Sequence, residues 1–257
     1  MPDRELMPAA DLAVVLTFHA EGAHAAAALA SVHRAVVPLM EAGLRAEVVC
    51  VLDAADEPTA NCVSSFAQRA GWTIVRTEYR DPGQARNRGV AESTGTFVAI
   101  QDGDDYMSQE WLLRAYKSAN AMARPAVFHP EYVLSFGDER QFFQHISTSE
   151  RAFHPDGLLM FNAWKVQVVA YRDIFVQIPY LPRVQGSARY IYEDWQWHCE
   201  TLGRGIPHEI VAGTAILYRA SARGVQHTDH NTYATFGPTT LFSNRRVLPR
   251  SAGGSSP

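Results

Sequence analysis

The N-terminal part of the chain alternates between short, continuous apolar runs and longer segments whose apolar residues recur at helical spacing. Continuous apolar runs are typical of strands that are buried on both faces of a parallel sheet. The predicted strands are residues 11–18, 46–52, 73–77 and 97–101. The predicted helices between them are residues 23–40 and 59–70, with Thr59 as the N-cap of the second, and residues 81–91 are a loop that runs into a third helix. This order predicts strand–helix–strand units and a parallel sheet.

The alternation is looser after residue 107. We expect a helix over residues 110–123, a strand over 127–136 and a late strand over 210–218. The segment 250–257 is rich in Gly and Ser, which is typical of a disordered tail.

Composition narrows the function classes. Of the 257 residues, 47% are hydrophobic and 19% are charged, an ordinary globular profile. The formal net charge is −4 and Lys and Arg form no run, so we expect no nucleic-acid partner. Cys50, Cys62 and Cys199 lack the spacing of a zinc site or a disulfide framework, and Cys50 is expected to be a buried thiol.

The sequence pattern favours a soluble, cytoplasmic protein. No segment approaches the roughly 18 consecutive apolar residues of a membrane span. The first five residues are acidic, unlike the basic start of a signal peptide. Docking to a membrane surface stays open.

Three carboxylates follow the last of the four N-terminal strands: Asp102, Asp104 and Asp105. Ligands bind at the carboxyl ends of strands in open α/β sheets, and acids gathered there repel one another unless a cation or strong donors balance them. Mg²⁺ and Mn²⁺ prefer carboxylate oxygens, commonly together with substrate phosphates. The alternative is an acidic turn that caps a helix near Ser108. A GxGxxG fingerprint after the first strand and a GxxxxGK[ST] loop are both absent.

Further segments resemble a known family. The first predicted strand ends in Thr17-Phe18-His19, and the second ends at Asp53. Residues 83–89 read Gly-Gln-Ala-Arg-Asn-Arg-Gly, and residues 101–105 read Gln-Asp-Gly-Asp-Asp. Residues 192–195, Tyr-Glu-Asp-Trp, precede an aromatic segment. In this order, these segments resemble the family 2 glycosyltransferases, which transfer sugars from nucleotide donors with inversion.

The resemblance is clear over roughly residues 11–110 and, beyond them, rests on the Glu-Asp pair. It implies an α/β architecture of the GT-A, nucleotide-diphospho-sugar transferase type, a Rossmann-like fold with a mostly parallel central sheet flanked by helices. It also implies one domain over residues 1–249. About 11–106 would be the nucleotide-sugar-binding half and about 107–249 the acceptor-binding half.

On the donor side, the resemblance implies that a divalent ion, Mn²⁺ or Mg²⁺, bridges the diphosphate. Asp104 is the main expected metal ligand, with Asp102 and Asp105 sharing metal and ribose contacts. Spacing leaves open which of the three carboxylates binds the ion. His227 is a candidate third ligand, and Arg219 or Arg223 a candidate diphosphate partner.

The nucleotide sugar is expected to contact Thr17, Phe18, Asp53 and Arg86. Asp53 would accept a hydrogen bond from the base, since an ionised carboxylate offers only acceptors. The family usually has two aspartates here, and this chain retains one. A turn or N-cap role is the alternative for Asp53. Arg86 could bind the diphosphate or pack on the base, and one of Arg86 and Arg88 could be a surface charge.

The catalytic residues implied by the resemblance are the Glu193–Asp194 pair. Asp194 is the expected general base, which removes the proton of the acceptor hydroxyl as the sugar transfers. Glu193 is expected to be structural or to bind the acceptor. The alternative is an acidic first turn of a helix, favoured by the helix dipole.

The expected partners are a UDP- or GDP-linked sugar and a glycan, lipid-linked or small-molecule acceptor. The irregular region 137–189 is compatible with a lid, an acceptor loop or a homodimer contact. Two other functions stay open: a nucleotide-sugar-binding module without turnover, and a sugar nucleotidyltransferase. The latter would be expected to carry a basic Gly-rich loop after the first strand, where residues 19–22 read His-Ala-Glu-Gly.

Overall fold

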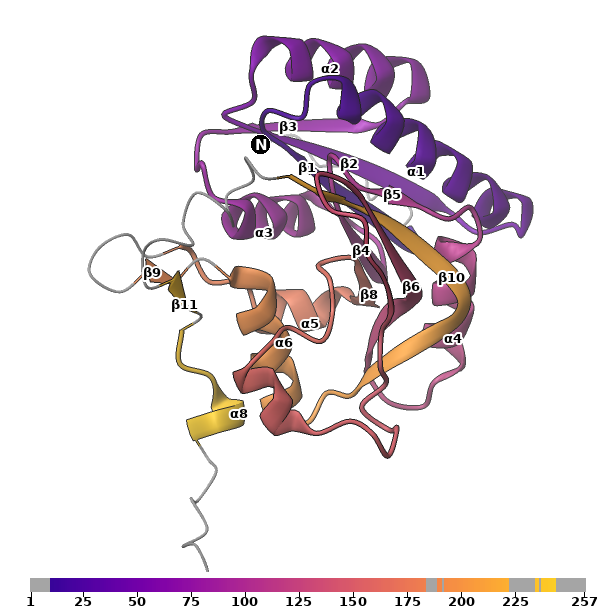
Figure 1. Cartoon of the computed structure of the whole chain (residues 1–257). Coiled ribbons are helices and arrows are strands. Elements are labelled where there is room, and N and C mark those ends of the chain that lie inside the picture. Colours follow the sequence, from indigo (N-terminus) through magenta and orange to yellow (C-terminus); the bar gives the residue numbers. More distant parts are fainter. Residues whose placement is uncertain (1–9, 184–188, 191, 222–233, 236, 244–257) are drawn as a thin grey trace, which may run out of the picture.

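The computed structural model describes residues 10–183, 189–190, 192–221, 234–235 and 237–243. Its centre is a nine-stranded sheet (Figure 1). The strand order is β3-β2-β1-β4-β8-β6-β10-β5, and β7 pairs with β6 beside this path. The tail predicted at 250–257 lies outside the described residues. The strands of this sheet are β1 (Leu12–Phe18), β2 (Ala46–Asp53), β3 (Thr73–Thr77), β4 (Phe97–Asp102), β5 (Tyr106–Met107), β6 (Val127–Gly137), β7 (Phe142–Gln144), β8 (Val168–Tyr171) and β10 (His208–Ala220).

The remaining elements are helices and a small second sheet. Strands β9 (Arg189–Tyr190) and β11 (Ala234–Thr235) pair in parallel. The helices are α1 (Ala23–Glu41), α2 (Glu57–Ala70), α3 (Pro82–Glu92), α4 (Trp111–Ala121), the 3-10 helix η1 (Pro155–Leu159), α5 (Arg172–Gln177), α6 (Glu193–Gly203) and α8 (Thr240–Ser243). No helix within the described ranges is long and apolar enough to cross a membrane.

The sheet is parallel in its N-terminal part, as the apolar runs predict. β1 pairs in parallel with β2 and β4, and β2 with β3. β8 then runs antiparallel to both β4 and β6, whereas β6 and β10 are parallel. The predicted α/β fold class is therefore confirmed, with a sheet that becomes mixed after its first four strands.

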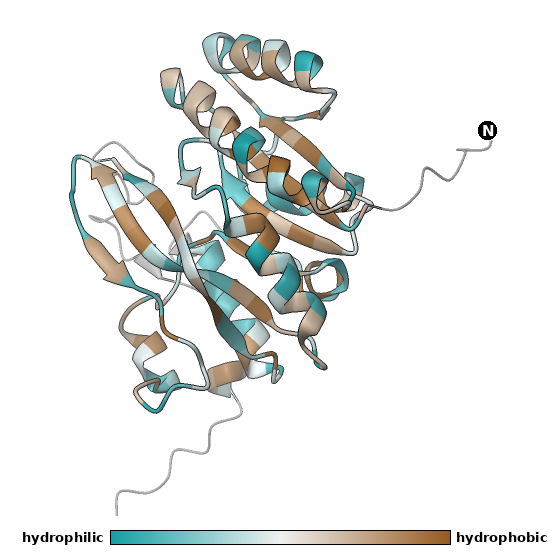
Figure 2. Cartoon of the chain, turned by 90° about the vertical axis from the view of Figure 1, so that its right-hand side faces the viewer, coloured by the Kyte–Doolittle hydropathy of each residue, from teal (hydrophilic) through white to brown (hydrophobic). Residues whose placement is uncertain are grey.

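Helices cover both faces of the sheet (Figure 1). α1, α2 and α4 pack on one face, where Leu12 and Val14 are buried among their apolar side chains. α3, α5 and α6 cover the opposite face, where Ala13 and Val15 of the same strand are buried. Both faces of β1 are covered, which explains its unbroken apolar sequence. In Figure 2 the strands are mostly hydrophobic, whereas the helices mix hydrophobic and hydrophilic residues.

The start of α2 differs from the prediction. Asp56, not Thr59, is the N-cap, because its side chain accepts a hydrogen bond from the Thr59 N–H at 3.0 Å. Thr59 is buried and its hydroxyl accepts from the Gly22 N–H at 3.0 Å, which ties α2 to the start of α1. The helix therefore begins two residues before Thr59.

The region 137–189 holds regular structure that the sequence pattern did not predict. β8 occupies the middle of the sheet, between β4 and β6. Val168, Val169 and Ala170 of this strand are fully buried. This short strand joins the N-terminal parallel strands to the rest of the sheet.

Candidate active site

The carboxyl ends of the parallel strands bring three predicted site residues to one edge of the sheet. Thr17 near the end of β1 is in register with Asp102 at the end of β4, and Asp53 ends the neighbouring β2. The Thr17 hydroxyl donates to Asp102 Oδ1 at 3.3 Å. These side chains therefore lie where open α/β sheets bind their ligands.

Gly103 lets the chain turn tightly after Asp102. Its N–H donates to the Thr17 carbonyl at 2.9 Å. A Cβ at this position would lie 2.3 Å from Phe18 Cδ1 and 2.7 Å from the Thr17 carbonyl oxygen. Phe18 is 1% exposed and belongs to the apolar core. The Phe18 ring thus packs against the acidic turn, rather than on the open surface that its predicted nucleotide contact would require.

Arg86 connects the two acidic segments of the predicted site. Its Nη2 donates to both oxygens of Asp102, at 2.9 and 3.0 Å, and its Nη1 donates to Glu193 Oε1 at 2.8 Å. Arg183 Nε donates to Glu193 Oε2 at 3.2 Å. The guanidinium also lies over the Tyr180 ring, 5.4 Å from its centroid. The N–H donors of the planar guanidinium are thereby occupied by carboxylates of the protein, and Arg86 is only 3% exposed.

Glu193 is held as an ionised structural anion. Burial alone would raise its pKa, but the positive charges of Arg183 and Arg86 outweigh burial and lower the pKa of Glu193 below its ordinary value. Glu193 is the first residue of α6. Its two ion pairs therefore fix the start of that helix, and with it the position of Asp194.

The rest of the 83–89 segment fixes α3 and its neighbours. A Cβ at Gly89 would lie 2.2 Å from Val15 Cγ1, so the glycine allows α3 to approach β1 closely. Asn87 binds both backbone groups of Tyr180: its Nδ2 donates to the carbonyl at 2.8 Å, and its Oδ1 accepts from the N–H at 3.0 Å. Arg88 pairs with Glu92 on the surface, which confirms that one of the two arginines is a surface charge.

Asp104 and Asp105 point to different surroundings. Asp104 Oδ2 accepts from Arg219 Nη1 at 2.8 Å, and 28% of its side chain is exposed. Asp105 is 1% exposed and accepts hydrogen bonds from the backbone N–H of Arg219 and from the Gln167 side chain. Burial, and then the charge of Asp104, raises the pKa of Asp105 well above its ordinary value. Asp105 thus ties the acidic turn to β10, whereas Asp104 stays accessible.

Glu21 adds a carboxylate that the sequence analysis did not single out. It follows β1 and its Oε2 accepts from the His19 N–H at 2.7 Å. Burial, with a smaller contribution from the negative charge of Asp104, raises the pKa of Glu21 to about 7. The acidic turn therefore acts electrostatically on a carboxylate just beyond the end of β1 as well.

Asp194 lies in the first turn of α6, directly after the anchored Glu193. Its Oδ2 accepts from Asn162 Nδ2 at 3.1 Å. Burial raises the pKa of Asp194 to about 6, and the charge of Glu193 acts in the same direction. At neutral pH the carboxylate is ionised and is a stronger base than an exposed aspartate.

Lys165 brings a cation to the same region. Its Nζ lies 4.0 Å from the centroid of the Tyr218 ring and 5.7 Å from that of Phe143. Burial lowers the pKa of Lys165, whereas the charges of Asp194 and Asp105 raise it. The ammonium thus partly balances the carboxylates of both segments.

Asp53 is bound by the loop that follows β3. Its carboxylate accepts from the Thr77 hydroxyl at 2.9 Å and from the N–H groups of Tyr79 and Asp81 at 2.7 and 2.9 Å. Asp53 is 5% exposed. Asp81 in turn caps α3 by accepting from the Gln84 N–H at 2.9 Å. Asp53 therefore organises the approach to α3, which agrees with the turn alternative considered for it.

The chemistry of Asp102 and Asp104 suits a divalent cation. Each side chain is 28% exposed at the end of β4, and both offer hard oxygen atoms. Burial, and then the charge of Asp102, raises the pKa of Asp104, so the acids repel one another despite Arg219. Within the described ranges no group of three or more metal-ligating side chains forms, and magnesium commonly uses one or two carboxylates with phosphates. His227, the other predicted ligand, and Arg223 lie outside the described residues.

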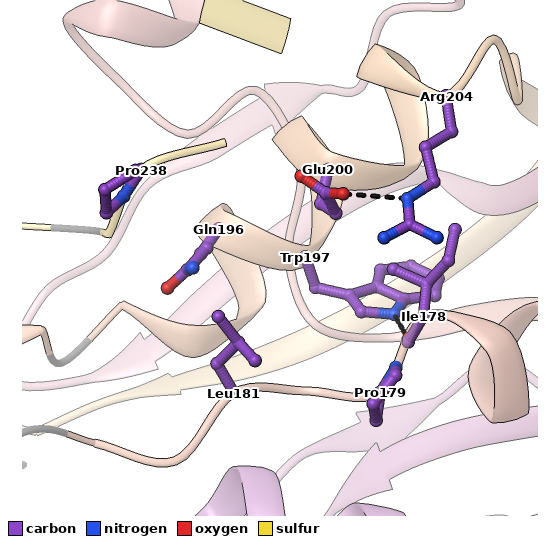
Figure 3. Close-up of a pocket in the computed structure, with 8 residues that line it drawn as sticks. All are labelled: Ile178, Pro179, Leu181, Gln196, Trp197, Glu200, Arg204 and Pro238. Atoms are coloured by element: carbon purple, nitrogen blue, oxygen red, sulfur yellow. Dashed lines mark hydrogen bonds and ion pairs between the residues drawn. The ribbon is translucent and has the colours of Figure 1, made fainter. Parts of the chain in front are cut away.

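A pocket of about 230 Å³ lies on another face of α6 (Figure 3). Gln196, Trp197 and Glu200 of α6 and Arg204 directly after it line the pocket, and neither Asp194 nor the acidic turn does. Ile178, Pro179, Leu181 and Pro238 complete the lining. The pocket is therefore separate from the carboxylates described above.

Asn162, Arg183, Lys165 and Glu21 were missed by sequence reasoning. They belong to none of the short motifs that resemble the family, and each is an isolated polar residue in a loop or a break between elements. Arg219 was foreseen as one of two candidates after the last strand, and the structure places it on Asp104.

Comparison with known sequences gives one family. Residues 13–174, more than half of the chain, match the family described as "Glycosyl transferase family 2". The succinoglycan biosynthesis protein ExoO of Rhizobium meliloti (strain 1021) is 31% identical over 83 residues, which are 32% of this chain and 24% of ExoO. The chain thus matches only about a quarter of that relative.

Solved structures show the same fold at low identity. Staphylococcus aureus TarS 1–349 in complex with UDP-GlcNAc has a TM-score of 0.64 and 15% identity, covering 85% of this chain and 60% of that one. The mannosyltransferase PcManGT from Pyrobaculum calidifontis, in complex with GDP-Man and Mn²⁺, has a TM-score of 0.59 and 14% identity, covering 84% of this chain and 59% of that one. Both likenesses confirm the GT-A architecture, and the matched segment shows that the chain belongs to glycosyl transferase family 2.

Proposed function

We propose that this chain is an inverting glycosyltransferase that moves a sugar from a nucleoside-diphosphate sugar to an acceptor hydroxyl. The observation that carries the proposal is the Arg86 guanidinium, which binds Asp102 on one side and Glu193 on the other. This link joins the start of α6, which carries Asp194, to the end of β4, where the donor diphosphate would lie. Family membership and the nucleotide sugars bound by TarS and PcManGT support the same reaction class.

Asp194 is the proposed general base. It accepts the proton of the acceptor hydroxyl as the oxygen attacks the anomeric carbon from the face opposite the diphosphate, which inverts the configuration. Its pKa of about 6 keeps it ionised at neutral pH while increasing its basicity. Glu193 acts through its ion pairs, by fixing the start of α6.

Asp104, with Asp102, is proposed to hold Mn²⁺ or Mg²⁺ against the diphosphate. Such an ion, when bound, acts as a Lewis acid that neutralises the leaving group. Arg219 lies 2.8 Å from Asp104 and supplies a guanidinium for the same phosphates. Asp105 contributes by holding this arginine's backbone.

The nucleoside is proposed to lie along the ends of β1 and β2. Thr17 supports the Asp102 carboxylate, and Asp53 shapes the Tyr79–Asp81 loop that borders this edge. Asp53 would affect base binding through that loop. The acceptor would approach from the Asp194 side; its class, whether glycan, lipid-linked or small molecule, is for the transfer assay to identify.

The test measures nucleotide binding and sugar transfer with UDP- and GDP-sugars, with and without Mn²⁺. Asp104→Ala is expected to lose metal-dependent nucleotide binding. Asp194→Asn is expected to bind the nucleotide normally and to lose transfer. Asp173→Asn is the matched control, because Asp173 also lies in the first turn of a helix, α5, and is exposed.

Full transfer by Asp194→Asn would show that another group is the base. Metal-dependent binding that survives in Asp104→Ala would overturn the metal assignment. If the wild-type chain binds nucleotide sugars and transfers nothing to any acceptor or to water, it is a binding module. If it joins a sugar phosphate to a nucleoside triphosphate instead, it is a nucleotidyltransferase.

A further inference from the structure

Asn162 contacts the Asp194 carboxylate from the loop that follows η1. Its Nδ2 lies 3.1 Å from Asp194 Oδ2. Its Oδ1 lies 3.2 Å from His198 Nδ1 and 3.4 Å from the backbone nitrogen of Trp164. Asp194 and His198 are four residues apart on α6, so they lie on the same face of the helix and both meet this amide.

The partners of Asn162 determine the orientation of its amide. A backbone N–H can only donate, so the Asn162 atom that faces Trp164 is the oxygen, and the nitrogen faces Asp194. Because the amide oxygen only accepts, His198 must donate to it from Nδ1. His198 Nε2 is then a bare, buried nitrogen without a hydrogen-bond partner among the described residues. Because Nε2 has no acceptor among the described residues and burial lowers the pKa of His198 well below its ordinary value, the imidazole is neutral and holds the amide without adding charge.

The loop carrying Asn162 is anchored in the protein. Trp164, two residues later, is 1% exposed, and its indole N–H donates to the Ile146 carbonyl at 2.8 Å. The ring stacks on His129 and His208, with centroids 5.2 and 4.2 Å away. This packing gives Asn162 a fixed position relative to α6.

We propose that Asn162 is a positioning residue for glycosyl transfer, which holds the Asp194 carboxylate in one orientation and stabilises its ionised form through the N–H donated to Oδ2. The inference rests on the proposed function, in which Asp194 is the general base. An amide suits this role, since it donates a hydrogen bond to the carboxylate and carries no charge of its own.

Several other groups act on the same carboxylate. Glu193 of α6 disfavours its ionised form, whereas Arg86 of α3 and Lys165 of the loop before β8 favour it. Neutral titratable side chains also surround Asp194, namely Tyr180, His198, Cys199 and Tyr218. The wild-type residues at all these positions are kept in the test, so that only the Asn162 donor changes.

Two variants isolate the Asn162 donor. Asn162→Asp keeps an oxygen for His198 and for the Trp164 N–H, and it removes only the amide donor while adding a carboxylate. Asn162→Ala removes the whole amide. Asn61→Asp makes the same chemical change at an exposed position of α2, on the opposite face of the sheet, and serves as the control.

We expect both Asn162 variants to bind the nucleotide sugar with the wild-type KM and to transfer it with a kcat lowered about 10- to 100-fold, the effect of a misplaced catalytic group. The acid limb of the kcat profile should move to higher pH in Asn162→Ala by about one unit, the size expected for one lost hydrogen bond to a charged group. It should move further in Asn162→Asp, because the added carboxylate repels the ionised Asp194.

A carboxyl ¹³C titration, assigned with Asp194→Asn, measures the pKa of Asp194 directly and needs no substrate. An unchanged pKa of Asp194 in both Asn162 variants, or an unchanged kcat and acid limb, would overturn the inference. If the variants lose stability and nucleotide binding to the same extent while the acid limb of the kcat profile stays in place, the inference is also overturned. A residue with a purely structural role would give that result. Absence of transfer by the wild type contradicts the proposed function instead, and the titration still decides whether Asn162 controls Asp194.

Discussion

Arg86 Nη1 lies 2.8 Å from Glu193 Oε1, a contact between residues 107 positions apart. Both side chains are buried, and the same guanidinium also binds Asp102. One side chain of α3 thus sets the spacing between the end of β4 and the start of α6. This ion-pair network ties the two acidic segments of the site into one unit.

Replacing Arg86 should therefore damage both stability and activity. Arg86→Ala leaves the buried Glu193 with Arg183 alone and Asp102 without its cation, so we expect a loss of about 3 kcal/mol or more in the free energy of unfolding. Arg88→Ala, in the same helix, removes only a surface pair with Glu92 and should cost about 0.5 kcal/mol or less. Urea denaturation of the two variants measures the difference, and equal losses would contradict the role given to Arg86.

Gly103→Ala tests the tight acidic turn. The added methyl group would meet Phe18 Cδ1 at 2.3 Å and the Thr17 carbonyl oxygen at 2.7 Å, so the turn or the core must shift. We expect a loss of about 1–3 kcal/mol in stability and weaker metal-dependent nucleotide binding. Gly157→Ala is the control, because the nearest atom to its Cβ would be at an ordinary 3.4 Å. A Gly103→Ala protein with wild-type stability and binding would show that the turn has room to adjust.

Asp194→Asn should stabilise the protein at neutral pH. Folding raises the pKa of Asp194 from 3.8 to about 6, so the folded state binds more protons than the unfolded state between these values. The ionised carboxylate therefore destabilises the folded state above pH 6, and this cost disappears as the pH falls below about 4.

We expect Asp194→Asn to gain about 1–2 kcal/mol in the free energy of unfolding at pH 7.5, less than the full shift implies because water still reaches the side chain. The gain should vanish at pH 4. Thermal and urea denaturation at both pH values measure it. A destabilised Asp194→Asn at pH 7.5 would mean that the hydrogen bond from Asn162 and the positive charge of Lys165 outweigh the burial of the carboxylate.

His145 should make the fold sensitive to mild acid. Its Nδ1 donates to the Pro130 carbonyl at 2.7 Å and its Nε2 accepts from the Lys165 N–H at 3.1 Å, so the ring must be neutral. Burial lowers its pKa to about 4. The unfolded chain takes up this proton near pH 6.5, so stability is lost as the pH falls below that value.

Between pH 7.5 and 5.5, one such histidine costs about 1.3 kcal/mol. The loss of stability over this range should therefore be smaller by about that amount in His145→Gln than in the wild type. Urea denaturation at the two pH values gives the comparison. Glu21 and Asp194, whose raised pKa values act in the opposite direction, contribute equally to both proteins. Their contribution therefore cancels when the pH-dependent change in unfolding free energy of the variant is compared with that of the wild type. An identical loss of unfolding free energy between pH 7.5 and 5.5 in the two proteins would show that His145 does not contribute to the acid sensitivity of the fold.

Local pattern predicted the N-terminal part of the fold because three of its four strands, β1, β2 and β4, are buried on both faces. The runs around Leu12, Val49 and Ile100 could only be buried strands, and parallel strands must end at one edge. The acids after β4 were found because they directly follow such a strand, whereas the Glu-Asp pair at the start of α6 was found only through the resemblance to the family. Asp102, Arg86 and Glu193 were singled out, although nothing local indicated that they bind one another.

The remaining features depend on contacts between distant segments. β8 has four residues, and its place between β4 and β6 is decided by pairing rather than by its own pattern. Asn162 approaches Asp194 because Trp164 anchors its loop, and no spacing rule relates the two. The family motif predicted that Phe18 contacts the nucleotide. In the structure its ring is buried instead, in space that the absence of a side chain at Gly103 leaves open.

The irregularity in β10 has a mechanical consequence. The strand runs from His208, whose Nε2 contacts Thr201 of α6 at 2.9 Å, to Arg219 beside Asp104. Its register with β6 shifts between Val211 and Ala215, where Gly213 has a φ of +70°. Regular pairing with β6 holds the strand on either side of this bulge, so under the proposed function we expect a displacement of Arg219 by a phosphate to be taken up at the bulge. In that case the bulge would separate movements of Arg219 from α6, the helix that carries the proposed base Asp194.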